Sequence, residues 1–299
     1  MVSQILCLLL LLLFSVALSS GIPLENWNTT FGGAGEEFGI DIVETPDGGF
    51  LILGTTTSYG TDCDDSDIPC YPKENIWLIK TDVNGNSEWD KIFGDPVSCE
   101  LASGIKQTSD EGYIIIGNLK AYKNGDYSRI LLIKINSEGT EEWNRTYGES
   151  YGGYAFSGVE TEASGYLITG SYINLTTGYF DYYILKIDND GAEQWNKTYP
   201  FDTGSIAYDI EKTADGNYII LGYTSFSQDT PLHAIVMIIE PSGNVILQKD
   251  IYGTNFLCGF DITNSPDGGY IFTGVDTDFQ TDTQIALFQS VLTSPGQTT

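Results

Sequence analysis

The chain is short of the residues on which many catalytic centres depend. It has a single histidine, His233, and two methionines among 299 residues. A metal site built on two histidines is excluded, and a Ser-His-Asp triad would have to use this one residue. We therefore expect His233 to be a surface histidine or one with satisfied hydrogen bonds. No glycine-rich loop joins a strand to a helix, which argues against a phosphate-binding loop.

Basic residues are also scarce. There are 13 Lys and Arg against 41 Asp and Glu, so the formal net charge is -28. Such a surface repels nucleic acid and anionic lipid and favours cations or basic partners. The plainer reading is solubility in an extracellular or salty medium.

Long apolar runs are limited to the N-terminus. The run at residues 5–18, "ILCLLLLLLFSVAL", is short for a membrane span and suits the core of a signal peptide, which we place at 1–20. No Lys or Arg precedes it, so an uncleaved N-terminal anchor is the alternative. We expect a secreted or cell-surface protein.

What the sequence has in abundance is a repeat of strands and turns. Trp89 and Trp143 are 54 positions apart, and Trp143 and Trp195 are 52 apart. Each unit has an inner segment such as "GIDIVET", a turn such as "PDGG", an apolar strand such as "YIIIG", and a strand pair such as "IWLIKTDVNGNSEWDKIFG". Asp and Gly supply the positive backbone angles of tight hairpins.

The second and third strands of each unit are nearly continuous apolar runs, such as "YIIIG" and "ILLIKI". Such strands are covered on both faces. No segment has a helical period, so four-stranded sheets stacked around an axis are the arrangement that buries both faces. The sequence predicts an all-β fold, a five-bladed β-propeller of four-stranded antiparallel blades.

The domain limits follow from the repeat. We expect one propeller domain at 26–292 and a tail at 293–299, with blades at about 36–94, 99–148, 153–200, 205–253 and 257–292. The fifth unit has three strands, and residues 26–32, "NWNTTFG", match the fourth strand of the others. We expect this N-terminal strand to pair with the last blade and close the ring, which removes exposed sheet edges.

The motifs "W-N-x-T-Y-G", "D-G-G-Y-I-I-x-G" and "W-L-I-K-T-D-x-x-G-x-x-x-W" resemble tandem propeller repeats of exported archaeal and bacterial proteins. The segment from Asp82 to Trp89 also resembles the tryptophan-docking repeat of quinoprotein dehydrogenases. The spacing between its aspartate and its glycine is one residue shorter than in that repeat. Kelch repeats also have a glycine pair and a tryptophan. Their glycine pair follows the apolar strand, whereas here it precedes that strand. The resemblance implies that Trp89, Trp143 and Trp195 pack between blades.

The recurring lysine of the third strand is read as structural, because two of the five units lack it. It is present as Lys80, Lys134 and Lys186 and replaced by Ile238 and Gln289.

The loop at 58–75 departs most from the repeat. It holds four carboxylates, Asp62, Asp64, Asp65 and Asp67. Their alternation resembles the start of a calcium-binding loop, but the sixth position is Asp instead of Gly and the twelfth is Lys instead of Glu. An irregular calcium site and a solvated acidic loop are both open. Calcium is the one cofactor that the sequence suggests.

Four cysteines lie beyond the leader. Cys63 and Cys70 are expected to form a disulfide within the acidic loop, and a second bridge between Cys99 and Cys258 is open, with free buried thiols as the alternative. Four N-x-T sequons, at Asn28, Asn144, Asn174 and Asn196, are candidate glycosylation sites.

The leading functional prediction is a non-catalytic exported propeller that binds a protein, a glycan or a cation at its loop face, because the sequence singles out no catalytic residues. We expect a monomer with an extracellular protein or glycan as partner. The alternative is a carbohydrate-active enzyme, a glycosidase or lyase, by analogy with other five-bladed propellers. A quinone- or metal-dependent oxidoreductase comes third. Paired carboxylates with raised pKa values in one pocket would favour an enzyme.

Overall fold

The computed structural model describes residues 27–59, 73–94, 98–120, 128–148, 152–162, 165–201, 203–224, 232–253, 256–265, 268–277 and 284–290. In this part of the chain every regular element is a β-strand. It contains no helix with the length and apolar character needed to span a membrane.

The strands form five separate antiparallel sheets. Blade one comprises β1 (Glu37–Glu44), β2 (Phe50–Thr56), β3 (Asn75–Thr81) and β4 (Ser87–Phe93). Blade two comprises β5 (Cys99–Gln107), β6 (Tyr113–Lys120), β7 (Ser128–Ile135) and β8 (Glu141–Tyr147). Blade three comprises β9 (Gly153–Glu160), β10 (Tyr166–Ile173), β11 (Phe180–Ile187) and β12 (Glu193–Tyr199). Blade four comprises β13 (Ser205–Lys212), β14 (Tyr218–Thr224), β15 (Ala234–Ile239) and β16 (Val245–Ile251), and blade five comprises β17 (Phe256–Asn264), β18 (Tyr270–Thr277) and β19 (Gln284–Ser290).

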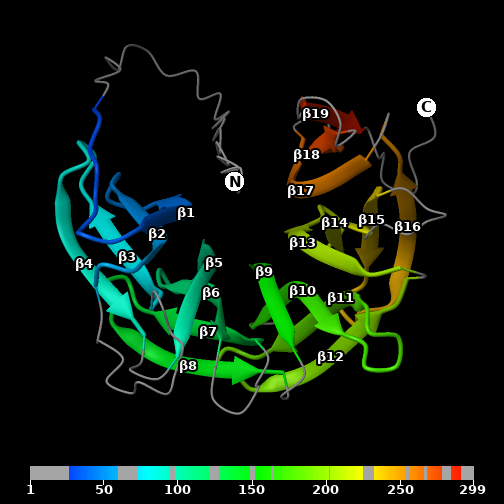
Figure 1. Ribbon diagram of the computed structural model, residues 1–299, viewed down its shortest axis with the longest axis horizontal. Helices are drawn as coiled ribbons and strands as arrows, with labels where there is room; N and C mark the ends of the chain where they lie inside the picture. Colours follow the sequence, from blue (N-terminus) through cyan, green and yellow to red (C-terminus); the bar gives the residue numbers. More distant parts are fainter. Residues whose placement is uncertain are drawn as a thin grey trace, which may run out of the picture.

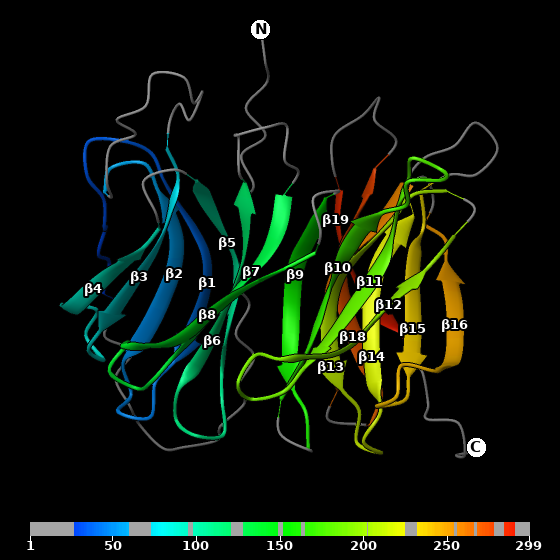
Figure 2. The same ribbon diagram turned by 90° about the horizontal axis from the view of Figure 1, so that it is seen from below.

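The sheets are arranged around a central axis, as Figure 1 shows. The first strand of each sheet is innermost, and the fourth strands β4, β8, β12 and β16 lie at the periphery. Seen from the side, the inner strands run roughly along the axis (Figure 2). The predicted all-β, five-bladed propeller of antiparallel blades is confirmed.

The hydrophobic core consists of layers between neighbouring blades. The second strand of blade two shows how they form, because Ile115 joins the cluster shared with blade one while Ile114 and Ile116 join the cluster shared with blade three. Further clusters lie between blades three and four and between blades four and five. Successive side chains of one strand therefore enter different cores. This is why these strands read as continuous apolar runs instead of alternating ones.

The outer-strand tryptophans pack against the next blade. Each ring covers a glycine with positive φ in the following β-hairpin turn, and the pairs are Trp89 with Gly139, Trp143 with Gly191 and Trp195 with Gly243. A Cβ atom at Gly139 would lie 2.5 Å from the Trp89 ring. Glycine is thus required twice, for its backbone angle and for the close approach of the ring. The tryptophans are wedges between blades, each burying apolar surface.

The N-terminal segment carries a tryptophan in the equivalent place. Trp27 lies over Gly85 of blade one, and its ring centroid is 6.1 Å from that of Phe50. Trp27 thus occupies the position of a fourth-strand tryptophan from a blade that precedes blade one. Residues 27–36 form no strand, and the described part of the fifth sheet has three strands. Closure of the ring by strand pairing stays a prediction.

Candidate active site

The five inner strands share an irregularity at one level of the axis. Each has a β-bulge, where one residue is left out of the pairing with the second strand. The bulged residues are Ile40, Ser103, Phe156, Tyr208 and Phe260. Bulges twist a strand and redirect its side chains, and they are frequent next to active sites. Five bulges at one level therefore mark a site to examine.

Three bulged residues form an aromatic group between consecutive inner strands. Phe156 of β9 stacks on Tyr208 of β13 with ring centroids 4.6 Å apart. Phe260 of β17 meets Tyr208 edge-on with ring centroids 5.1 Å apart, and Tyr223 of β14 stacks on Tyr208 at 5.6 Å. Phe260 is 37% exposed. This group offers an apolar face with one solvent-exposed ring.

Ionisable side chains follow directly after the bulges. Asp41, Asp209 and Asp261 occupy the same repeat position in blades one, four and five, whereas blades two and three have Gly104 and Ser157 there. Two residues further along the inner strand are Lys106 in blade two and Glu211 in blade four. All four carboxylates act electrostatically on Lys106. Five charged groups from four blades therefore meet near the axis.

Two of these carboxylates hold neighbouring blades together. Asp41 accepts hydrogen bonds from the backbone N–H groups of Ile42 at 2.8 Å and of Ile105, in blade two, at 3.0 Å. Asp209 accepts one from the Ile262 N–H of blade five at 2.9 Å and one from the Ser157 hydroxyl of blade three at 2.6 Å. Asp41 and Asp209 thus fix the spacing of the inner strands.

Burial also raises the pKa of Asp41, and the two remaining carboxyl groups have raised pKa values as well. Burial raises the pKa of Glu211 to about 7, partly offset by the attraction of Lys106. Desolvation, the charge of Asp209 and a hydrogen bond with Asp209 raise the pKa of Asp261 to about 6. Lys106 itself is favoured in its charged form, because the four carboxylates outweigh the effect of its burial on its pKa. One carboxyl group that keeps its proton near neutral pH thus lies close to another that can lose it.

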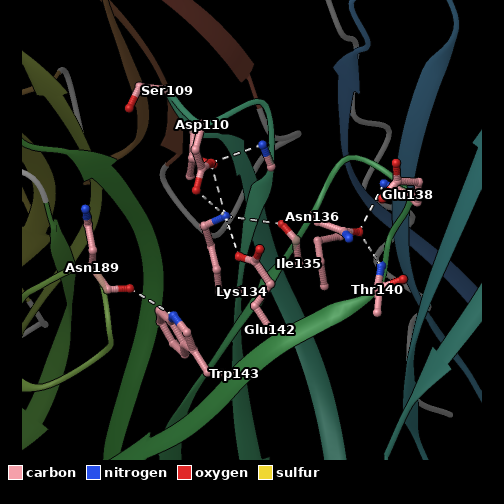
Figure 3. A network of polar contacts seen from close by, with 12 residues as sticks. Ser109, Asp110, Lys134, Ile135, Asn136, Glu138, Thr140, Glu142, Trp143 and Asn189 are labelled. Atoms are coloured by element: carbon pink, nitrogen blue, oxygen red, sulfur yellow. Dashed lines mark hydrogen bonds and ion pairs between the residues drawn. The ribbon is translucent and has the colours of Figure 1, made fainter.

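The third-strand lysines lie away from the axis, at the hairpin turns. Lys134 is buried and its Nζ lies 3.0 Å from Asp110 Oδ2 and 3.1 Å from Glu142 Oε2, as Figure 3 shows. It also donates a hydrogen bond to the Ile135 carbonyl at 3.3 Å. Such a cluster ties the turn to the third and fourth strands, which agrees with the structural role expected for these lysines.

The sites predicted from the sequence lie elsewhere. Asp62, Asp64, Asp65, Asp67, Cys63 and Cys70 fall outside the described residues. Asn144 and Asn196 are exposed on the outermost strands β8 and β12, Asn28 is exposed in the N-terminal segment, and Asn174 is half-buried after β10. Glycosylation of these residues stays a prediction. Within the described part of the chain, no group of three or more His, Cys, Asp or Glu residues is arranged to hold a metal ion.

Two further expectations concern single residues. Cys99 and Cys258 lie on inner strands of blades two and five and form no disulfide with each other. His233 is buried, with its Nδ1 3.2 Å from the Thr224 hydroxyl and its ring stacked on Tyr252. Its polar contact is satisfied within blade four, as expected for a structural histidine.

Sequence reasoning missed the axial carboxyl groups. Their signal was present, because Asp recurs at one repeat position in three of five units. The position alone does not reveal a site, since an aspartate that bonds to the next blade and one that faces the axis occupy the same place in the repeat. The bulge and the convergence of blades one, four and five appear only in the folded ring.

No protein-family model and no curated protein matches the sequence. Solved structures do match. An endo-arabinase from Bacteroides thetaiotaomicron superposes with a TM-score of 0.50 at 11% identity, covering 89% of this chain and 99% of that chain. A thermostable family-43 glycoside hydrolase gives 0.51 at 11% identity, with 91% and 97% covered. A protein of unknown function from Dyadobacter fermentans gives 0.57 at 10% identity, with 82% and 77% covered.

At these identities the likeness shows the fold alone, a β-propeller, as the repeat resemblance implied. Together with the axial carboxyl groups, it corrects the leading functional prediction. Two of these three structures are glycoside-cleaving enzymes, and the structure places carboxyl groups with raised pKa values at the axis. The non-catalytic scaffold prediction is therefore wrong. It rested on the lack of catalytic residues in the sequence, which could not show groups that converge from different blades.

Proposed function

We propose that this protein is a carbohydrate-active enzyme that cleaves glycosidic bonds at the propeller axis. The observation that carries the proposal is the pair of carboxyl groups with raised pKa values, Glu211 and Asp261, beside an exposed aromatic ring. Glycosidic cleavage needs a carboxylic acid to protonate the leaving oxygen and a carboxylate to act on the opposite side. The family-43 glycoside hydrolase and the endo-arabinase with this fold support the choice of glycans as substrates.

The roles follow from the environment of each group. Glu211 has the higher pKa and therefore is assigned as the general acid. Asp261 loses its proton first and is assigned as the base or nucleophile. Asp41 and Asp209 are positioning residues, because their oxygens are engaged by backbone N–H groups of the next blade. Phe260 provides an apolar surface on which a sugar ring can stack.

The remaining expectations fit this proposal. An exported enzyme, with the leader at 1–20 and a single propeller domain at 26–292, would meet glycans outside the cell. The net charge of -28 suits that setting and disfavours nucleic acid as a partner. We propose a monomer in which any calcium would be bound by the acidic loop, with Asp62, Asp64, Asp65 and Asp67 as ligands.

The test is a screen of the purified protein against arabinan, other polysaccharides and a set of aryl glycosides. Release of reducing sugar indicates hydrolysis, and an unsaturated product detected by ultraviolet absorbance indicates a lyase. Asp261→Asn should abolish the activity, and Glu211→Gln should abolish it on polysaccharides, with the fold intact in both variants. Glu138→Gln, an exposed carboxylate in the β7–β8 turn, is the matched control and should keep it. Failure of the wild-type protein on every substrate, or full activity of both axial variants, would overturn the proposal.

A further inference from the structure

Blades one, two and three share a buried lysine in the third strand. Lys80, Lys134 and Lys186 are 6%, 2% and 7% exposed. Each lies beneath the hairpin turn that joins the first two strands of its blade. The three sites therefore form an internal comparison in which the lysine holds the same repeat position and the surroundings of the ammonium group differ.

The lysines of blades one and two are neutralised. Lys80 Nζ lies 2.9 Å from both Asp47 Oδ2 and Glu88 Oε2 and donates to the Thr81 carbonyl at 2.8 Å. Blade two repeats the arrangement around Lys134 (Figure 3). The acidic partners in both blades are solvent-exposed, with side-chain exposures of 59% for the aspartates and 45% for the glutamates. The carboxylate positions around each lysine are thus open to solvent.

Blade three keeps the lysine and has lost both acids. Position 163 is alanine where the other two blades have aspartate, and position 194 is glutamine where they have glutamate. Among the described residues, the hydrogen-bond partner of Lys186 Nζ is the Thr161 hydroxyl at 2.8 Å. The Thr161 hydroxyl in turn lies 3.3 Å from the Gly165 carbonyl, to which it donates. The neighbouring Glu162 does not fill the gap, because its carboxylate pairs with Lys212 at 2.8 Å.

A buried ammonium without a counter-ion is unfavourable. It has three N–H donors, of which one has a hydrogen-bond partner for Lys186 among the residues that the structure describes. Burial lowers the pKa of Lys186, whereas Lys80 has a raised pKa because its two carboxylates outweigh its desolvation. A bound anion would relieve the same penalty without loss of the proton. The sister blades show which anion fits, because each holds carboxylate oxygens about the equivalent nitrogen.

We propose that Lys186 and Thr161 form a binding site for a carboxylate group from solution, at the hairpin-turn end of blade three. The ligand takes the place that Asp110 and Glu142 occupy around Lys134. Its carboxylate accepts hydrogen bonds from Lys186 Nζ, and Gln194, at the repeat position of Glu142, offers an amide as a further donor. A free small carboxylate and the uronate group of an acidic glycan share this chemistry. The site lies away from the axis and does not depend on the proposed cleavage reaction.

The experiment uses the full-length protein with acetate, glucuronate and chloride as probes at equal ionic strength. Thermal unfolding reports binding, and NMR of 15N-labelled lysine side chains reports the pKa of Lys186, with Lys134 as the internal reference. Acetate or glucuronate should raise the melting temperature of the protein and the pKa of Lys186. The NMR titration of Lys134 should not change. If glucuronate binds more tightly than acetate, the ligand is the carboxylate of a glycan. If acetate binds as tightly or more tightly, the ligand is a free small carboxylate.

Two variants make the test specific. Lys186→Met removes the cation and should weaken acetate binding by about tenfold or more, as expected for loss of a charge-assisted hydrogen bond. Gln194→Glu restores the acid found in blade two and should raise the pKa of Lys186 without added ligand and weaken acetate binding. Chloride that acts as strongly as acetate would overturn the proposal. So would an acetate effect that is absent in the wild-type protein or equal in all three proteins.

Discussion

Replacing Glu211 by glutamine should stabilise the protein at alkaline pH and leave its stability unchanged at acidic pH. The pKa of Glu211 is about 7 in the folded protein against 4.5 as the ordinary value. The folded state therefore holds this proton more tightly than the unfolded chain. The resulting contribution to stability is fully present below pH 4.5 and is lost as the pH rises through about 7.

The magnitude follows from the size of the shift. A difference of about 2.5 pKa units corresponds to at most about 3 kcal/mol of the free energy of unfolding. Glu211 is partly exposed, so solvent screening reduces that value. Glutamine cannot ionise, so the variant does not lose this stability as the pH rises. Lys106 remains compensated, because Asp41, Asp209 and Asp261 still surround it.

Thermal or urea unfolding of both proteins between about pH 4 and pH 8 measures the effect. A domain of this size gains about 2 to 4 °C in melting temperature for each kcal/mol. Glu138→Gln, on the exposed β7–β8 turn, should follow the wild-type protein at every pH. A difference between Glu211→Gln and wild type that does not change with pH would refute the reasoning.

Three further predictions concern the frame and the acidic loop. Gly139→Ala should lower the free energy of unfolding by about 2 kcal/mol or more, because this residue has a φ of 72° and its added Cβ would meet the Trp89 ring. Gly48→Ala has the backbone strain alone and should lower the free energy of unfolding by about 1 kcal/mol. Urea unfolding of both variants checks this, and equal losses would contradict the wedge role of Trp89. Deleting residues 26–32 removes Trp27 and the predicted closing strand and should lower the melting temperature by many degrees, and a truncated protein that melts like the parent would rule out closure. Calcium should raise the melting temperature and chelator lower it if the loop at 58–75 binds the ion, and an unchanged transition would count against that site.

The repeat made the architecture predictable. Most hairpins turn at a glycine, often as Asp-Gly or Asn-Gly, and apolar runs such as "YIIIG" contribute residues to two cores. Strand type, blade number and burial on both faces therefore follow from local chemistry. Trp89 could be assigned as a wedge because its repeat resembles the tryptophan-docking repeat, in which the tryptophan packs between blades.

The candidate site could not be predicted in the same way. Asp41 and Asp261 are far apart in the sequence and lie in blades one and five, so only the ring brings their charges together. The raised pKa of Glu211 depends on burial at the axis, which no local pattern encodes. The Asp62 cluster drew attention because its carboxylates are close together in sequence, whereas the axial groups are close only in space.

The pH dependence of kcat/KM on the best glycoside substrate tests the central claim most directly. With Asp261 ionising at about pH 6 and Glu211 staying protonated up to about pH 7, we expect a narrow bell-shaped profile between these values. Glu211→Gln should abolish the activity on a poor leaving group and remove the alkaline limb on an activated aryl glycoside. A profile that keeps its alkaline limb in Glu211→Gln, or a wild-type protein that cleaves no glycoside at any pH, would contradict the account.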